Sequence, residues 1–167
     1  MRTMLRHVPS GDFVIYDTAV DDWDWQGSAD YIEVPEGEDA PELLAAARLA
    51  KWERVKRRRE RAQDGGVDVP GIGRVDSDPE SRQLISGAVQ MALIAQGSGE
   101  PLTIEWTLAD NDVASLDAAA VIAMGLAVGA HVDACHGVAR DLRSTIEGCP
   151  SAAALDAIDV DGAAWPD

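Results

Sequence analysis

Apolar and polar residues alternate in short runs near the N-terminus. The segments "FVIYD" at 13–17 and "YIEV" at 31–34 have the period of two that is typical of strands, and the residues between them are mostly polar and acidic. Trp23 and Trp25 are also two residues apart, which agrees with this period. We therefore expect a small β-rich module over residues 1–40.

The pattern becomes helical near residue 41. Pro41 and Glu42 suit the first turn of a helix, and Gly65 with Gly66 suits its end. The sequence predicts one helix over 41–64, acidic at its start and basic near its end, as the helix dipole favours. Its apolar residues share one broad side: Ala45, Leu49, Trp52 and Val55. We interpret this segment as a connecting helix between two modules.

A second module is predicted over residues 65–147. "VDV" and "RVD" flank "PGIG", which indicates a tight β-hairpin, and Ser77 with Asp78 before Pro79 marks the start of a helix that runs to about residue 96. The apolar residues of that helix form two adjacent stripes: Leu84, Ala88, Met91 and Ala95 in one, and Ile85, Val89 and Ala92 in the other.

Strict alternation follows in "LTIEWTL" at 102–108, and "VASL" after a short turn predicts a partner strand. We expect Trp106 to be largely buried. A helix over 118–146 then has apolar residues at alternating spacings of four and three, which predicts a continuous packing seam: Val121, Gly125, Val128, Val132, Cys135, Ala139, Leu142 and Ile146. Residues 148–167 form an acidic tail in this interpretation. The expected fold class is α+β.

The net charge of −16 changes the range of partners to consider. A nucleic-acid-binding protein usually carries a basic surface, so this charge disfavours that role and favours contact with a basic protein surface. The start of the chain lacks the apolar segment of a secretory signal, and two cysteines do not make a disulfide framework. No apolar run reaches the roughly 18–20 residues of a membrane span. We expect a soluble protein of the cytoplasm, at least until it is assembled into a larger structure.

Motifs that could carry chemistry are incomplete. "GGVDVPGIG" lacks the Gly-Lys-Ser/Thr of a phosphate-binding loop, and "DSDPE" and "DNDVASLD" lack the glycine and closing glutamate of a calcium loop. His131 and Cys135 lie one helical turn apart, but a zinc site or a cysteine nucleophile would need groups from another element. We therefore expect no catalytic residue, no cofactor and no metal.

The run "KWERVKRRRER" at 51–61 is the strongest charge feature. It could contact nucleic acid, but such a run is more often a solvated helix face or a surface that binds acidic protein, including the acidic N-terminal module of this chain. Exposed aromatic side chains also mark protein contacts. The candidate partner-binding residues are Trp23, Trp25, Tyr31, Trp52, Arg57 and Arg58.

From Trp52 onward, the order of features resembles one family. Trp-Glu, a basic run, Gly-Gly, a short hairpin, Ser-Asp-x-x-Ser-Arg, a helix, a strand with Trp, an Asp-bearing turn and a closing helix follow each other over residues 52–147. This order is similar to a domain of unknown function found in proteins of the tail-fibre region of tailed bacteriophages and prophages. The matching residues are Trp52, Glu53, Lys56, Gly65, Gly66, Ser77, Asp78, Ser81, Arg82, Trp106, Asp110 and Asp112.

The resemblance implies a non-enzymatic tail accessory protein. Such a protein would bind the tail fibre or the distal tail and baseplate, either as an assembly chaperone or as a retained structural component. It would work in the virion tail or in the host cytoplasm during assembly, as a homo- or hetero-oligomer. Two alternatives stay open: a nucleic-acid-binding regulator that uses residues 51–61, and a fibre-tip hydrolase, which would need a polar cluster from several elements.

Overall fold

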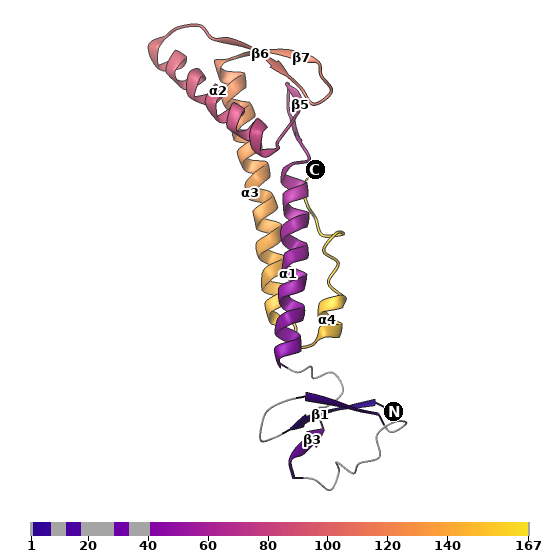
Figure 1. Ribbon diagram of the computed structural model, residues 1–167. Helices are drawn as coiled ribbons and strands as arrows, with labels where there is room; N and C mark the ends of the chain where they lie inside the picture. The colour runs from indigo at the N-terminus through magenta and orange to yellow at the C-terminus, as the bar shows by residue number, and fades with distance from the viewer. Residues whose placement is uncertain (1, 8–12, 18–28, 34–40, 167) are drawn as a thin grey trace. The chain divides into compact units, whose positions relative to one another are not determined.

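The computed structural model describes residues 2–7, 13–17, 29–33 and 41–166, and it has the α+β fold that the sequence predicts (Figure 1). The chain divides into two compact units. One contains the residues up to Trp52 together with Thr145–Ile158, and the other contains Glu53–Ser144 together with the chain from Asp159 onward. The two long helices, α1 and α3, contribute residues to both units. The four-part division made from the sequence stays a prediction.

A small antiparallel sheet lies near the N-terminus. It consists of β1 (Arg2–His7), β2 (Phe13–Asp17) and β3 (Tyr31–Glu33), in the order β2-β1-β3. The positions of β2 and β3 agree with the sequence prediction. The central strand β1 was not predicted, because the three basic residues of "RTMLRH" hide its alternation. Trp23 and Trp25 lie outside the described residues.

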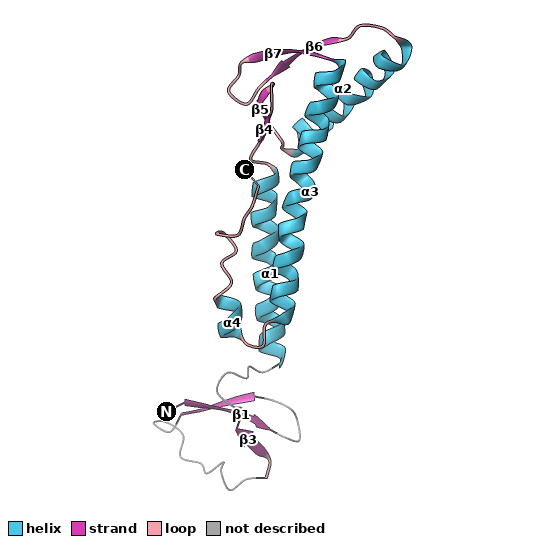
Figure 2. Ribbon diagram, turned by 180° about the vertical axis from the view of Figure 1, so that it is seen from behind, coloured by secondary structure: helices cyan, strands magenta, loops and turns pink. Residues whose placement is uncertain are grey.

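Helix α1 spans Pro41–Gln63, close to the predicted 41–64. It ends before Gly66, which is buried and has the positive φ of 85° that favours glycine. From Glu53 on, α1 runs beside α3 in both views (Figures 1 and 2), and Val55 and Ala62 are its buried apolar positions there. Leu49 was predicted to share this side, but it is largely exposed.

The predicted hairpin follows α1. Strands β4 (Val67–Val69) and β5 (Gly73–Val75) pair antiparallel, with Val67 opposite Val75. The alternation within β4 directs both of its valines inward and Asp68 outward. The hairpin therefore contributes apolar side chains to the core, which agrees with the structural role expected from its sequence.

Helix α2 spans Pro79–Ser98 and begins and ends at clear caps. The Asp78 carboxylate accepts hydrogen bonds from the backbone N–H groups of Glu80 and Ser81, and Gly99 ends the helix in the left-handed conformation. Of the first predicted stripe, Ala88 is buried, whereas the large members Leu84 and Met91 are exposed. The buried residues are Ile85, Ala88 and Ala92.

Strands β6 (Thr103–Thr107) and β7 (Val113–Asp117) form the predicted ribbon, with Trp106 opposite Ala114. Trp106 is half-buried, so the expectation that it is largely buried was too strong. Its side chain packs at the edge of the core from a two-stranded ribbon that leaves the indole partly open to solvent.

Helix α3 spans Ala118–Gly148 and contains the predicted seam. Five of the eight predicted positions are buried: Val121, Val128, Cys135, Ala139 and Ile146. Met124 and His131 are also buried, and they complete a spacing of three and four residues along the helix. Gly125, Val132 and Leu142 are partly buried.

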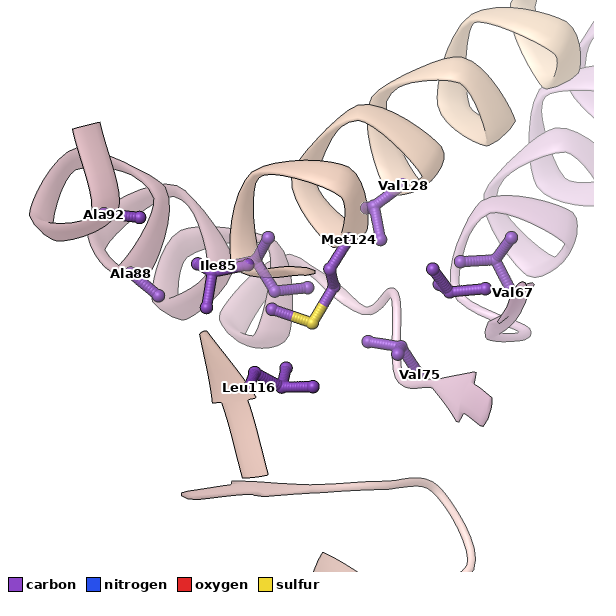
Figure 3. Packing of buried hydrophobic residues seen from close by; sticks show 10 residues of the cluster. Val67, Val75, Ile85, Ala88, Ala92, Leu116, Met124 and Val128 are labelled. Carbon is purple, nitrogen blue, oxygen red and sulfur yellow. The ribbon is translucent and has the colours of Figure 1, made fainter. Parts of the chain in front are cut away.

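The hairpin, α2, the ribbon and the first half of α3 share one hydrophobic core (Figure 3). Met124 is fully buried in it, and Figure 3 shows its side chain among residues from the other elements. The buried members are Val67, Val69, Val75, Ile85, Ala88, Ala92, Leu116, Val121, Met124 and Val128.

The C-terminal region, which the sequence analysis interpreted as an acidic tail, contains a short helix and several buried side chains. Ser151 caps the short helix α4 (Ala152–Asp156), in which Leu155 is buried. In the same unit, Cys149 is buried and its carbonyl oxygen accepts a hydrogen bond from the Arg48 guanidinium at 2.6 Å. In the other unit, Val160 and Trp165 are buried. No periodic pattern in the sequence marks either of these two residues.

Ser77 is expected to be essential for the junction between α1, the hairpin and α2. Its buried hydroxyl donates to the Gln63 carbonyl at 2.6 Å and accepts from the Gly66 N–H at 2.9 Å. Ser77→Ala leaves these buried groups without a partner, so it should lower the free energy of unfolding by about 1–3 kcal/mol. Urea denaturation followed by circular dichroism measures this, with the exposed Ser98→Ala as control. Equal midpoints for Ser77→Ala and wild type would contradict the assigned role.

Candidate protein-binding surfaces

The Ser-Asp-x-x-Ser-Arg motif forms a structural junction. The Arg82 guanidinium donates to the Ser77 carbonyl at 2.5 Å and to the Asp64 carboxylate at 3.0 Å. The Ser81 hydroxyl donates to the Asp78 carboxylate, and this hydrogen bond is the main reason that the pKa of Asp78 is lowered. These bonds connect the end of α1 to the start of α2. They account for the Ser-Asp-x-x-Ser-Arg pattern without a ligand.

The two acidic stretches that resemble calcium loops perform turn and cap roles. The Asp110 carboxylate accepts from the Asp112 N–H at 3.0 Å, and the Asp117 carboxylate accepts from the Ala120 N–H at 2.8 Å at the start of α3. Among the described residues, no group of His, Cys, Asp and Glu side chains is arranged to hold a metal ion.

His131 and Cys135 are both buried against α1. The His131 Nε2 atom lies 3.0 Å from the Ala62 carbonyl oxygen, to which it donates, and 3.9 Å from the Cys135 sulfur. Burial raises the pKa of the Cys135 thiol, which keeps it protonated and poorly nucleophilic at neutral pH. The pair therefore behaves as a core histidine with an apolar neighbour, as the sequence suggested.

The basic face of α1 contacts the C-terminal strap, which we define as residues 159–166. Asp161 forms ion pairs with Arg54, Arg58 and Arg61, and the shortest joins Arg54 Nη2 to Asp161 Oδ2 at 2.5 Å. The hydrogen bond from Arg54 lowers the pKa of the Asp161 carboxyl and raises that of Arg54. A C-terminal segment of the chain thus provides one acidic partner for this basic run. The predicted contact with the acidic N-terminal module stays a prediction, because most of the module's acidic residues lie outside the described residues.

Trp165 anchors the strap. Its ring lies under the Arg58 guanidinium, with the Cζ atom 5.4 Å from the ring centroid, and its Nε1 atom donates to the Val160 carbonyl at 2.8 Å. The side chain is 8% exposed. Arg58, a predicted partner-binding residue, is therefore engaged within the chain.

The other predicted partner-binding residues have different surroundings. Arg57 is exposed and lines an open polar hollow of about 610 Å³ together with Glu60, Arg61 and Asp64. Tyr31 on β3 and Trp52 on α1 are each half-buried. Of this set, Arg57 and Arg58 are adjacent in α1 but have different neighbours.

An apolar groove between α2 and α3 is a surface that the sequence-based set of candidate residues did not include. Its volume is about 600 Å³, and its main apolar lining residues are Ile85, Val89, Leu93, Ile122, Leu126 and Val132. Leu93 is 53% exposed and Leu126 is 71% exposed, although both are large and apolar. The signal in the sequence was the lack of Asp, Glu, Lys and Arg over residues 83–99 and 118–130. A helix that is apolar on all sides is normally covered on all sides.

Helix α3 is also long and apolar enough to cross a membrane by length and composition, which was not expected from the sequence. Helices in the cores of water-soluble proteins meet the same criterion. The uncharged stretch ends at Asp133, and Arg140, Asp141 and Arg143 follow within the same helix. The stretch before Asp133, residues 118–132, is shorter than the roughly 20 residues that a membrane-spanning helix needs.

These features define a class of protein: a small α+β protein with an exposed apolar groove between α2 and α3, whose motif residues hydrogen-bond to one another. The chain belongs to the family described as a domain of unknown function (DUF4376), which matches residues 46–162. The match includes the junction at Ser77 and Arg82, the groove and part of the strap. No curated protein and no solved structure matches the chain.

Proposed function

We propose that this protein is a non-enzymatic accessory protein of a bacteriophage tail. It binds the tail fibre or the distal tail and baseplate, as an assembly chaperone or as a retained component of the virion. The observation that carries the proposal is the exposed, uncharged apolar surface of α2 and α3, because a patch of this kind on an acidic chain is typical of a protein that works in a protein assembly. The phage-tail setting comes from the resemblance described above.

The remaining polar groups support a binding role over the two alternatives. The acidic residues of the motifs cap helices and turns, and Cys135 is buried with a raised pKa, so they favour neither a hydrolase nor a nucleophile. Arg54, Arg58 and Arg61 already contact Asp161, which reduces the positive charge that α1 offers to nucleic acid.

Co-expression with the fibre protein encoded next to this chain tests the proposal. We expect the tagged fibre to retain this protein through size-exclusion chromatography, or to become more soluble than when expressed alone. Arg57→Glu should weaken retention, because Arg57 is exposed, whereas the other predicted contact residues that the structure describes are partly buried. Arg140→Glu on α3 is the matched control, since Arg140 is also exposed. Absence of any effect on the fibre, together with absence from purified virions, would refute the proposal.

A further inference from the structure

We propose that the groove between α2 and α3 is the contact surface between two copies of this chain, which pair about a two-fold axis. This inference concerns the same exposed surface that supports the proposed function, and it assigns that surface to a second copy of the chain instead of the fibre. The reasons are the local shape of α3, the distribution of charge and the size of the surface.

The shape of α3 beside the groove is self-complementary. At Gly125, a Cβ atom would lie 2.5 Å from the Val89 side chain, so the glycine allows α2 and α3 to pack closely. At Gly129, one helical turn later, a Cβ atom would meet nothing within 4 Å. Gly129 is therefore an open gap at the groove, and the exposed Leu126 is a projecting side chain three residues away.

A gap and a projection so close together on one helix suit an isologous contact. A two-fold axis that passes between residues 126 and 129 places Leu126 of each copy over Gly129 of the other. When a large side chain of one helix packs over a small residue of another, the two helices can approach closely. A partner with a different sequence would need to provide both features independently.

The charge distribution restricts where a second copy can bind. Each chain has a net charge of −16, so two copies repel each other over most of their surfaces. Residues 83–99 and 118–130 contain no Asp, Glu, Lys or Arg, which makes this surface the place where two equally acidic chains can approach. Arg82, which lines one end of the groove, is paired with Asp64.

The surface reaches the lower end of the range for a stable pair. Helix α2 has 20 residues and is therefore about 30 Å long. Two such helices side by side present about 30 Å by about 20 Å, or roughly 600 Å² per copy before side-chain relief is counted. This approaches the roughly 800 Å² per partner of a typical stable interface. Two large apolar residues that line the groove are more than half exposed: Leu93 and Leu126.

Light scattering and sedimentation equilibrium of the purified full-length chain test the proposal. We expect wild type to show twice its monomer mass of 17.7 kDa. Leu126→Glu should weaken self-association by at least about tenfold, because each pair would bury two unpaired carboxylates. Leu49→Glu is the matched control: it makes the same change at an exposed leucine of α1 and should leave the pair intact.

Gly129→Leu provides a second test that does not depend on introducing charge. The gap at Gly129 accepts a side chain without a clash at Cβ, and leucine favours a helix more than glycine does, so the monomer should fold as well as wild type by circular dichroism. The filled gap should block Leu126 of the second copy and weaken the pair by at least about tenfold.

Three outcomes would overturn the proposal. The first is a wild-type monomer at all concentrations. The second is a pair that Leu126→Glu and Gly129→Leu both leave intact, which would assign the contact to another surface. The third is a monomer that sediments with phosphatidylcholine–phosphatidylglycerol vesicles and loses this binding in Leu126→Glu, which would assign the groove to a membrane. Loss of the pair with retained fibre binding, or the converse, separates this proposal from the proposed function.

Discussion

Replacing Trp165 with alanine is expected to lower the free energy of unfolding by about 3–5 kcal/mol, the usual cost of removing a buried tryptophan. The indole is 8% exposed, it packs under Arg58, and its Nε1 atom is bonded to the Val160 carbonyl. The substitution removes all of these contacts and leaves Val160, which is fully buried, partly uncovered. Thermal and urea denaturation monitored by circular dichroism measure the loss.

Two matched variants serve as comparisons for Trp165→Ala. Trp106→Ala removes the same side chain from a half-buried site and should cost clearly less. Asp161→Asn removes the carboxylate from exposed ion pairs, which solvent screens, and should have a much smaller effect than Trp165→Ala. If Trp165→Ala melts like wild type while Trp106→Ala does not, the strap is not anchored by Trp165.

Met124→Ala should lower the free energy of unfolding by about 2–5 kcal/mol. Met124 is fully buried, and its thioether lies where residues of the hairpin, α2, the ribbon and α3 meet (Figure 3). Alanine leaves a cavity at this meeting point. Because the core is closely packed, the four elements cannot shift to fill the cavity without losing contacts elsewhere. The denaturant midpoint measures the effect.

Met91→Ala is the control for this prediction. It makes the same substitution on α2, but Met91 is 56% exposed, so the change in a dilute monomer should be within about 0.5 kcal/mol. A large loss of stability in Met91→Ala and none in Met124→Ala would mean that the side of α2 with Met91 faces the core, which would contradict the structure. The pair therefore tests the side of α2 that the sequence did not determine.

The case of α2 explains where prediction from sequence stops. Its boundaries follow from Asp78, Pro79 and Gly99, whose cap roles are local and can be read directly. Its buried side cannot be read in this way, because apolar residues surround the helix between Gln83 and Gly99. Ala88 and Ala92 face the core, and Gly125 of α3 packs closely against Val89 and Ile85 of the same helix. Both features depend on tertiary packing and not on local sequence.

The candidate surfaces also have some features that are visible in the sequence and others that depend on the tertiary structure. The basic run of α1 is visible in the sequence, but its contact with Asp161 joins residues about a hundred positions apart. Val160 and Trp165 lie in a segment with no periodicity, so no local pattern predicts their burial. The groove could have been anticipated from the lack of charge in two helices, but not the gap at Gly129, which depends on how the helices cross.

The two cysteines give the chain a built-in reporter of local unfolding. Cys135 belongs to the unit of Glu53–Ser144 and Cys149 to the other unit, and both thiols are free and buried. A thiol reagent can reach each sulfur only after its surroundings open, so the rate of labelling at each position measures the opening of that unit. Mass spectrometry of the two labelled peptides would show whether the units open together or one before the other.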